Sequence, residues 1–497
     1  MLSETYYVTF GTFFLILLVS IWYKNFWREI IDWKRIKAYG YSWVLYFHIL
    51  KTIRDVPFVM PAIIHRFKSR GFIYGNVFSQ KFVLLYHPRP LEKLLSDSEN
   101  IDRPLVQKLV RGIGENSLMF RNGEGWKMRK GALSRTFHQS ILEKCIPQIE
   151  RHSKILAEKL NAASYQWISF NQIIDSFSLK LLSEAIYGVS NTSWEKNYHG
   201  VDRLINSIKT SIFYGFVKMA LWSEVIFLLT GKGRSFSRDK SLARRITKEA
   251  VNERIRQIKE DGRHYLELGI TVPIIDHLWE TSANNPDITV DGIVDEIMTF
   301  LAAGSHSLAS AVCWSVYEIG KRPDVQKRIH QELDAVFENT ERRINKNDLQ
   351  SLTYLECVIN EVLRLYPSVP FTIRGSHENL QLGKEIFSEN TVYLVSIFHL
   401  HRNPEVFPRP RTFDPDRFRP ENSKCRSRYS FLPFLAGVRH CIANRYSMME
   451  MKIFLATLLR NFTIETFPKE ILPKMFHISL TTAEPVLIKV CPRIKRR

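Results

Sequence analysis

The chain has 497 residues, of which 45% are hydrophobic and 24% charged, and a formal net charge of +20. It is long enough to bury a large core, and its charge suits an anionic membrane or an acidic protein partner, whereas no helix-turn-helix, zinc-finger or RNA-recognition signature points to nucleic acid. Neither GxSxG nor HExxH occurs, which argues against serine-hydrolase and zinc-peptidase chemistry, and six scattered cysteines without a CxxC pair indicate a reducing compartment.

The N-terminal segment Thr5–Tyr23 carries no charged residue. As a helix rising about 1.5 Å per residue, it would roughly match the ~30 Å hydrocarbon core of a bilayer. A cleaved signal peptide is the alternative, but it requires basic residues before the apolar run. Here Glu4 precedes the run, and the basic residues follow it, namely Lys24, Arg28, Lys34 and Arg35. The positive-inside rule therefore predicts an uncleaved anchor at residues 1–24, with the bulk of the chain in the cytosol.

After the anchor, we expect residues 25–55 to be a linker close to the membrane. Residues 56–100 alternate short apolar runs with Gly and Pro, which predicts a small sheet. Residues 140–285 carry long helical patterns with polar breaks. We expect residues 56–497 to form one large domain.

A basic helix is predicted to begin at Gly123. Trp126 and Lys130 are four residues apart and share one face of this helix, and Arg129 lies beside Lys130. On its own, this pattern also fits a solvated basic helix anchored by one tryptophan.

The segment Asp291–Lys321 is largely apolar with helical spacing, which predicts a long buried helix. A glycine inside a helix costs roughly 1 kcal/mol, so Gly304 needs a reason. Two reasons remain open: the close approach of a flat cofactor, and a crossing with another helix.

Glu361 and Arg364 lie three apart on one predicted helix face, ahead of Pro367. Such pairs are common on solvated helices, so this motif is weak by itself.

Ser430–Ile453 contains one cysteine between an apolar loop and a helical pattern. Cys441 is expected at the N-terminal end of that helix, where unpaired N–H groups favour a thiolate. A thiolate with Arg439 two residues earlier suits an anionic porphyrin, in which sulfur ligates iron and the arginine meets a propionate. Phe434 would shield the sulfur, and Gly437 would allow a tight turn. A buried structural cysteine is the alternative for any lone cysteine.

The pattern Phe434-x-x-Gly437-x-Arg439-x-Cys441-x-Ala443 resembles the haem-ligand signature of the cytochrome P450 (haem-thiolate monooxygenase) family, with Ala443 where glycine is usual. The resemblance spans roughly residues 50–495. It implies a mainly α-helical cytochrome P450 fold, with a large helical domain, a small β-rich subdomain and the N-terminal membrane anchor helix. It also implies that haem b lies between the central helix and the cysteine loop, with Cys441 as the axial ligand of its iron.

The same resemblance assigns further roles. Trp126 and the residue at Lys130, an arginine in the family, contact a haem propionate, with Arg129 adjacent. Arg374 matches a position that commonly meets a propionate. Glu361, Arg364 and Arg417 are similar to a buried structural network that locks the cysteine loop.

The central helix resembles the family-four fatty-acid ω-hydroxylase branch, which expects an acid and then a threonine after the glycine to relay protons. His306 and Ser307 stand there, next to Gly304. Ala303 replaces a glutamate that esterifies the haem in some ω-hydroxylases, so that link cannot form. These four residues are the candidate catalytic set.

The resemblance implies a monooxygenase that inserts one oxygen atom from O2 into an apolar substrate, which is fatty-acid-like, steroid-like or a xenobiotic. NADPH and flavins would act through a partner reductase, with cytochrome b5 as a further candidate donor. The expected docking site is a basic proximal face, although scattered solvated charges are the alternative there; its residues are Lys127, Arg129, Lys130, Arg135, Lys424, Arg426 and Arg428. The family implies the endoplasmic reticulum membrane, with the catalytic domain facing the cytosol.

Two rival functions remain. His306 and Ser307 also fit a diverged haem-thiolate protein that uses peroxide, isomerises its substrate or only binds it. A membrane-anchored binding or scaffold protein without haem is the other.

Overall fold

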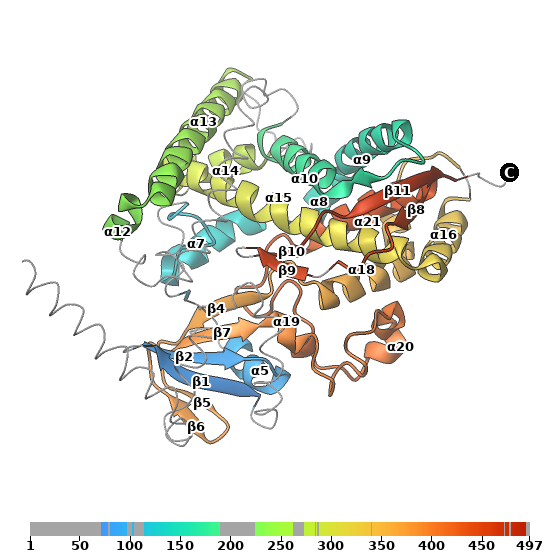
Figure 1. Cartoon of the computed structure of the whole chain (residues 1–497). Coiled ribbons are helices and arrows are strands. Elements are labelled where there is room, and N and C mark those ends of the chain that lie inside the picture. Colours follow the sequence, from blue (N-terminus) through green and yellow to red (C-terminus); the bar gives the residue numbers. More distant parts are fainter. Residues whose placement is uncertain are drawn as a thin grey trace, which may run out of the picture.

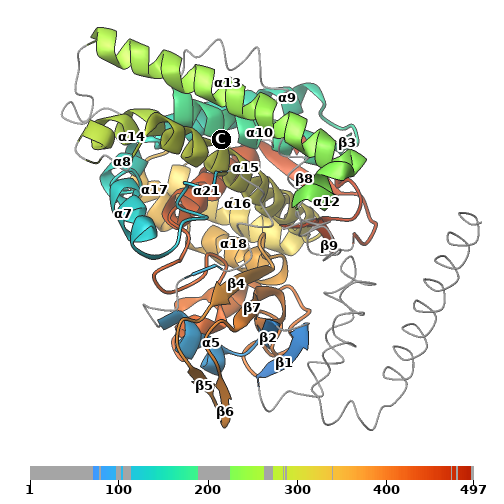
Figure 2. The ribbon, with the colours of Figure 1, turned by 90° about the vertical axis from the view of Figure 1, so that its left-hand side faces the viewer.

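The computed structural model describes residues 71–493 apart from 78–79, 97–101, 104–113, 189–223, 262–272, 284, 286–287, 339, 472 and 477–478. The predicted anchor at 1–24 and the linker at 25–55 lie outside these residues. A helical body is stacked on a smaller β-rich part (Figures 1 and 2). The expectation of a mainly α-helical fold with small sheets is confirmed.

The helices of the first half are α5 (Pro88–Ser96), α7 (Gly123–Ser134), α8 (Gln139–Lys144), α9 (Ile146–Ala162), α10 (Phe170–Tyr187), α12 (Glu224–Leu229), α13 (Gly231–Asp261) and α14 (Ile274–Ala283). Those that follow are α15 (Val290–Gly320), α16 (Pro323–Phe337), α17 (Lys346–Ser351), α18 (Thr353–Leu365), α19 (Ile397–Leu400), α20 (Pro420–Ser423) and α21 (Asn444–Asn461). Two 3-10 turns, η2 (Pro415–Phe418) and η3 (Arg428–Ser430), precede the cysteine loop.

The β-rich part is a four-stranded sheet in the order β1-β2-β7-β4, with a two-stranded hairpin of β5 and β6 beside it. The strands are β1 (Phe72–Val77), β2 (Gln80–Leu85), β4 (Phe371–Gly375), β5 (Leu380–Leu382), β6 (Glu385–Phe387) and β7 (Val392–Ser396). Strand β2 pairs with β7 in parallel, from Phe82↔Val392 to Leu85↔Val395. In the sequence, most of the helical body therefore lies between β2 and β7, two strands that are neighbours in one sheet.

Two smaller sheets belong to the helical body. One has the order β3-β11-β8, formed by β3 (Ile168–Ser169), β11 (Leu487–Pro492) and β8 (Phe462–Thr466). The other pairs β9 (Pro473–Phe476) with β10 (Ser479–Thr482).

Helix α15 runs through the middle of the helical body (Figure 1). The hydroxyl of Thr289 caps its first turn by accepting the Gly292 amide at 3.0 Å. Most of its side chains are buried, and it packs against α10, α13, α18 and α21. A Cβ at Gly304 would lie 2.8 Å from Leu182 Cδ2 on α10. The helix crossing, one of the two reasons left open for Gly304, is thus present in the structure, and the close approach of a flat cofactor stays a prediction.

Candidate active site

The loop that ends at Cys441 is closed by its own backbone. Cys441 N donates to Phe434 O at 2.8 Å, and Phe434 packs against the main hydrophobic core. Gly437 has φ +73°, and a Cβ there would lie only 2.0 Å from the carbonyl oxygen of Leu95 at the end of α5. Positive φ together with this close approach leaves room for glycine alone. Cys441 precedes α21 by three residues, close to the position that the sequence predicts.

The ionisation of Cys441 departs from the expectation based on the helix terminus. Burial raises the pKa of its thiol, and the Ala443 amide and the positive charge of Arg103 offset only part of this rise. The predicted stabilisation of the thiolate by nearby N–H groups is therefore present but is the smaller effect. Desolvation is the largest of these effects, so a bound metal cation is what would hold this side chain as a thiolate.

Three guanidinium groups gather beside the loop: those of the buried residues Arg374 and Arg439 and that of the half-buried Arg103. Burial, followed by mutual repulsion, lowers the pKa of Arg439 to about 9 and that of Arg374 well below its usual value. Burial also lowers the pKa of Arg103 to about 10. Within the described residues, neither Arg103 nor Arg374 has a carboxylate at ion-pair distance, and Arg103 Nε and Arg374 Nη2 are buried without a hydrogen-bond partner. Positive charges placed in this way suit a ligand that carries two negative charges.

These residues fit a porphyrin that carries two propionates. Unpaired buried cations cost free energy, and carboxylates are the anions whose geometry guanidinium groups match. The Cys441 sulfur lies close enough to Arg103 that its charge, when ionised, raises the pKa of the arginine. Arg103 was missed by the sequence analysis, and no motif or spacing around it could have revealed it, because its neighbours Arg374 and Arg439 are remote in the chain.

Trp126 and Lys130 both reach the cysteine loop from α7. Lys130 Nζ donates to Val438 O at 2.7 Å, and the Arg439 guanidinium lies 4.2 Å from the centre of the Trp126 ring. Trp126 is buried. Burial lowers the pKa of Lys130, and the charge of Arg439 lowers it further. The alternative of a solvated helix therefore does not describe this face of α7.

Arg129 lies on another face of α7 and is not brought to the arginine cluster. Its Nε is 3.4 Å from Glu296 Oε1 on α15, and both side chains are buried. Glu296 also accepts the Leu118 amide at 2.7 Å. Burial raises the pKa of Glu296 to about 8, although Arg129 opposes this rise. This pair attaches α7 and the segment before it to α15.

The candidate catalytic residues share one region of α15. Ser307 Oγ donates to Ala303 O at 2.8 Å and lies 3.3 Å from Gly304 O, so its proton points back along its own helix. His306 is half-buried. From outside the helix, Ser368 Oγ donates to Ser307 O at 2.9 Å. The sequence analysis did not single out Ser368.

Glu361, Arg364 and Arg417 come together as a buried network. Arg364 donates to both carboxylate oxygens of Glu361, at 2.7 and 2.8 Å, and Arg417 Nε lies 3.5 Å from Glu361 Oε1. Arg364 also donates to the carbonyl of His401, whose ring Nε2 accepts the Leu432 amide at 2.8 Å. Leu432 precedes the cysteine loop, so the network is joined to that loop through His401.

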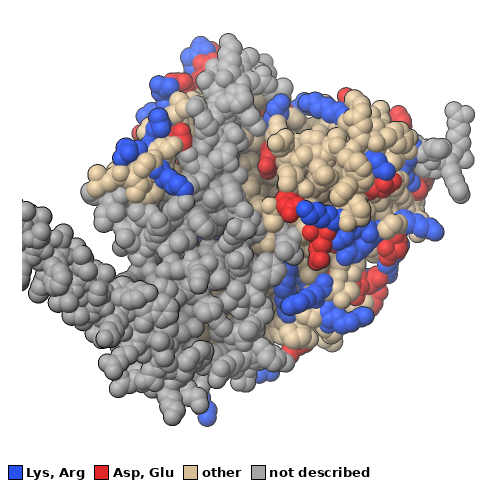
Figure 3. Space-filling view, viewed as in Figure 1, with Lys and Arg blue, Asp and Glu red and all other residues tan. Residues whose placement is uncertain are grey.

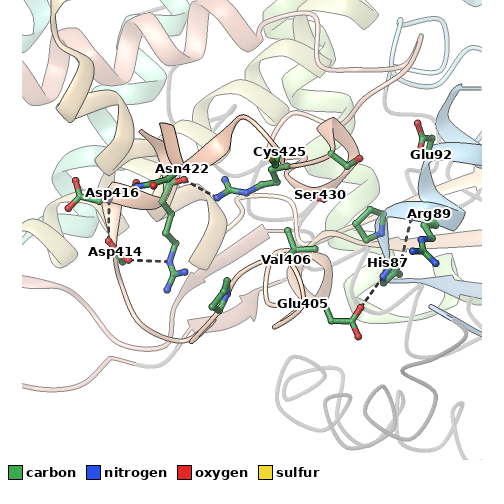
Figure 4. Close-up of a pocket in the computed structure, with 15 residues that line it drawn as sticks. His87, Arg89, Glu92, Glu405, Val406, Asp414, Asp416, Asn422, Cys425 and Ser430 are labelled. Atoms are coloured by element: carbon green, nitrogen blue, oxygen red, sulfur yellow. Dashed lines mark hydrogen bonds and ion pairs between the residues drawn. The ribbon is translucent and has the colours of Figure 1, made fainter. Parts of the chain in front are cut away.

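A surface pocket of about 650 Å³ lies between α5 and the segment before the cysteine loop (Figure 4). Many charged side chains line it, namely His87, Arg89, Glu92, Glu405, Asp414, Asp416, Arg417 and Arg426, together with Pro88, Val406 and Pro408. His87 Nε2 lies 3.5 Å from Glu405 Oε2 across it.

Comparison with known proteins identifies relatives along most of the chain. Residues 43–491 match the family described as Cytochrome P450. Cytochrome P450 4V2 of Mus musculus is 31% identical over 408 residues, which are 78% of this chain and 75% of the mouse protein. The Homo sapiens protein of that name is 27% identical over 507 residues, 91% of this chain and 94% of the human one. Cytochrome P450 4c21 of Blattella germanica is 29% identical and covers 80% of each chain.

Among solved structures, the one described as "Retinoic acid bound cyanobacterial CYP120A1" has a TM-score of 0.71 at 20% identity. The match covers 85% of this chain and 92% of the cyanobacterial one. At this identity the likeness concerns the fold alone.

Proposed function

This chain belongs to the cytochrome P450 family and is a haem-dependent monooxygenase, and we propose that it oxidises a fatty-acid-like substrate with electrons that NADPH supplies through a partner reductase. Steroid-like and xenobiotic compounds are the other apolar classes to be tested. The observation that carries the proposal is the Cys441 loop beside the arginine cluster of Arg103, Arg374 and Arg439. The choice of a lipid rests on the family-four names of the relatives and on the central helix.

The protein contributes the binding and orientation of the cofactor. Cys441 would supply the axial sulfur, and the three arginines, with Lys130 and Trp126 beside them, would hold the propionates. When bound, haem supplies oxygen activation, which an axial thiolate favours by pushing electron density toward the iron. The network of Glu361, Arg364 and Arg417 keeps the loop in place.

Ser307 and His306 are the proposed path for protons. Because the Ser307 hydroxyl donates its proton to Ala303 O, its oxygen lone pairs stay available to accept a hydrogen bond. An imidazole at position 306 can take up and release protons near neutral pH, as a carboxylate would in the family pattern.

His306 and Ser307 favour a second candidate, a diverged haem-thiolate protein that uses peroxide, isomerises its substrate or only binds it. They stand where the family pattern has an acid and a threonine. The two candidates differ in NADPH-dependent turnover.

The electron donor is proposed to be NADPH–cytochrome P450 reductase, with cytochrome b5 as a second donor. Lys424 and Arg428 before the loop, Arg445 at the start of α21 and Lys127 on α7 are exposed. Arg129 is buried against Glu296, so it does not belong to the docking face, whereas Arg426 is half-exposed and packs 4.7 Å from the centre of the Phe407 ring. On the face seen in Figure 3, basic and acidic residues are interspersed.

The proposed location is the endoplasmic reticulum membrane, with residues 1–24 as the anchor and the domain of residues 56–497 in the cytosol. The support is the uncharged segment Thr5–Tyr23 and the basic residues after it. In the described part of the chain, one helix is long and apolar enough to cross a membrane, Val290–Gly320, and two thirds of its most apolar window is buried in the protein.

The test uses the full chain purified in detergent. The reduced carbon-monoxide complex is expected to show the red-shifted Soret band of thiolate-ligated haem, and Cys441→Ala is expected to lose it. With reductase, NADPH and a panel of lipids, steroids and xenobiotics, we expect an oxygenated lipid product. A haem complex that forms no product with NADPH but reacts with peroxide would support the second candidate, and a colourless protein would support the scaffold.

A further inference from the structure

The short loop from Tyr366 to Pro370, between α18 and β4, contacts α15 at the residue proposed to handle protons. Ser368 lies in its middle and is half-buried. Its hydroxyl donates to the carbonyl oxygen of Ser307 at 2.9 Å, across 61 positions of sequence. A helix carbonyl already faces the amide four residues later, so Ser307 O receives a donor from outside its helix as well.

The loop is rigid on both sides of Ser368. Pro367 and Pro370 restrict the backbone, because proline fixes φ near −65°. Tyr366 stacks on Trp314 of α15, with ring centres 3.8 Å apart and planes tilted by 3°, and its hydroxyl donates to Glu318 at 2.6 Å. At the other end, Pro370 O accepts the Phe398 amide at 3.1 Å. These contacts fix the backbone on both sides of Ser368, and none of them depends on the hydrogen bond of the Ser368 hydroxyl.

A third element closes the arrangement into a ring of hydrogen bonds. Leu480 N on β10 donates to Ser368 O at 3.1 Å, and Leu480 O accepts from Ser310 Oγ at 2.6 Å. Loop, strand and helix thus each contact the other two. Along α15 the ring spans one turn, from Ser307 to Ser310.

Within this ring Ser307 is bonded at two points. Its hydroxyl donates to Ala303 O one turn earlier, and its carbonyl accepts from Ser368. The direction of the hydroxyl follows from the rotation and pitch of this turn, because the side chain can rotate only among a few staggered positions. A donor that holds the Ser307 carbonyl therefore also holds the backbone turn on which the bond from the Ser307 hydroxyl to Ala303 O is formed.

We propose that Ser368 is a positioning residue for Ser307, which holds this turn of α15 so that the Ser307 hydroxyl keeps its hydrogen bond to Ala303 O and its lone pairs stay available to the proton path. The proposal rests on the proposed monooxygenase function. It deepens that function by naming a residue outside the helix that controls the proton path. Loss of the Ser368 hydroxyl loosens the turn, so electrons are consumed without matching product, while substrate binding is unaffected.

The test compares Ser368→Ala and Ser368→Thr with the unaltered full-length haem protein. Ser315→Ala is the matched control, because this buried serine on the same helix donates to Ala311 O within the helix only. One readout is product formed per NADPH consumed, with KM for the substrate measured alongside. The other is hydrogen–deuterium exchange of the α15 peptide that contains Ala311, whose amide faces Ser307 O.

Ser368→Ala is expected to lower product per NADPH severalfold with unchanged KM, and to speed exchange of that peptide about fivefold, as for the loss of an ordinary hydrogen bond. Ser368→Thr is expected to retain both values, and Ser315→Ala to retain the product ratio. If Ser368→Ala does not fold, Ser368→Thr against Ser368→Val supplies the comparison, since these side chains have similar shapes but only threonine has a hydroxyl.

Unchanged coupling in Ser368→Ala would overturn the proposal, and so would unchanged exchange of the Ala311 peptide. If the monooxygenase proposal is wrong, the unaltered protein forms no product with NADPH. The hydrogen–deuterium exchange comparison would still show in that case whether Ser368 holds α15.

Discussion

The carbonyl oxygen of Leu95 lies 2.0 Å from the point where a Cβ at Gly437 would be, so α5 and the cysteine loop are in contact through their backbones. Gly437→Ala would have to move one of these backbones and would also hold alanine at positive φ, which alone costs roughly 1–3 kcal/mol. We expect Gly437→Ala to lose most bound haem, measured as the ratio of Soret to protein absorbance. The matched control is Gly383→Ala, because Gly383 also has positive φ but a Cβ there would meet no atom within 4 Å.

Arg374→Met is expected to weaken haem retention without destabilising the haem-free chain. In the absence of an anion, Arg374 is a buried cation repelled by Arg103 and Arg439, so its removal is neutral or stabilising. Toward a propionate, the loss of a charge-assisted hydrogen bond of about 1.5–3 kcal/mol reduces affinity roughly ten- to hundredfold. Haem transfer to apomyoglobin measures retention, and thermal unfolding of the haem-free chain measures stability.

The control for that experiment is Arg245→Met on α13, an exposed arginine. Equal haem transfer rates for Arg374→Met and Arg245→Met would show that Arg374 does not contact a propionate.

Glu361→Gln is expected to destabilise the protein by about 3–5 kcal/mol, because it leaves the buried Arg364 without its charge partner. Arg417→Met should cost less, since the Arg417–Glu361 distance is longer, 3.5 Å against 2.7 Å. Urea unfolding followed by circular dichroism measures both. A smaller loss for Glu361→Gln than for Arg417→Met would contradict the geometry of the network.

Glu450→Gln is expected to remove part of the pH dependence of stability. Burial raises the pKa of Glu450 from 4.5 to about 8, so the folded state favours the protonated acid. The stability that this proton provides is complete below pH 4.5 and is lost as the pH rises toward 8, at up to about 1.4 kcal/mol per pH unit. Glutamine cannot ionise, so the variant does not lose this stability as the pH rises. It should therefore be more thermally stable than the unaltered chain between about pH 6 and 8. Glu158→Gln, an exposed position on α9, should show no such trend.

His306→Asp distinguishes the two candidate functions. If His306 stands in for the acid of the proton path, aspartate at this position preserves or raises product per NADPH. A protein that does not activate O2 with NADPH should gain nothing from the change. Product analysis with reductase present decides between them.

Sequence spacing located the parts of the site that are local in the chain. The cysteine loop and the Glu361–Arg364 pair could be recognised because their members lie within one loop or one helical turn. Neighbouring positions in a helix do not share a face, because successive residues are about 100° apart around the axis. Arg129 therefore faces Glu296, whereas Lys130 faces the cysteine loop. Arg103 and Ser368 could not be found, because their partners are brought near only by the tertiary fold.

The parallel pairing of β2 with β7 also bears on synthesis of the protein. Phe82–Leu85 leave the ribosome long before Val392–Val395 are made, so this sheet cannot be completed until most of the chain has been translated. Pairings between such distant segments form slowly and leave strand edges exposed in the meantime. Until β7 has been made, the edge of β2 that pairs with it stays open, so we expect translation products that end before Val392 to be prone to aggregation through this edge.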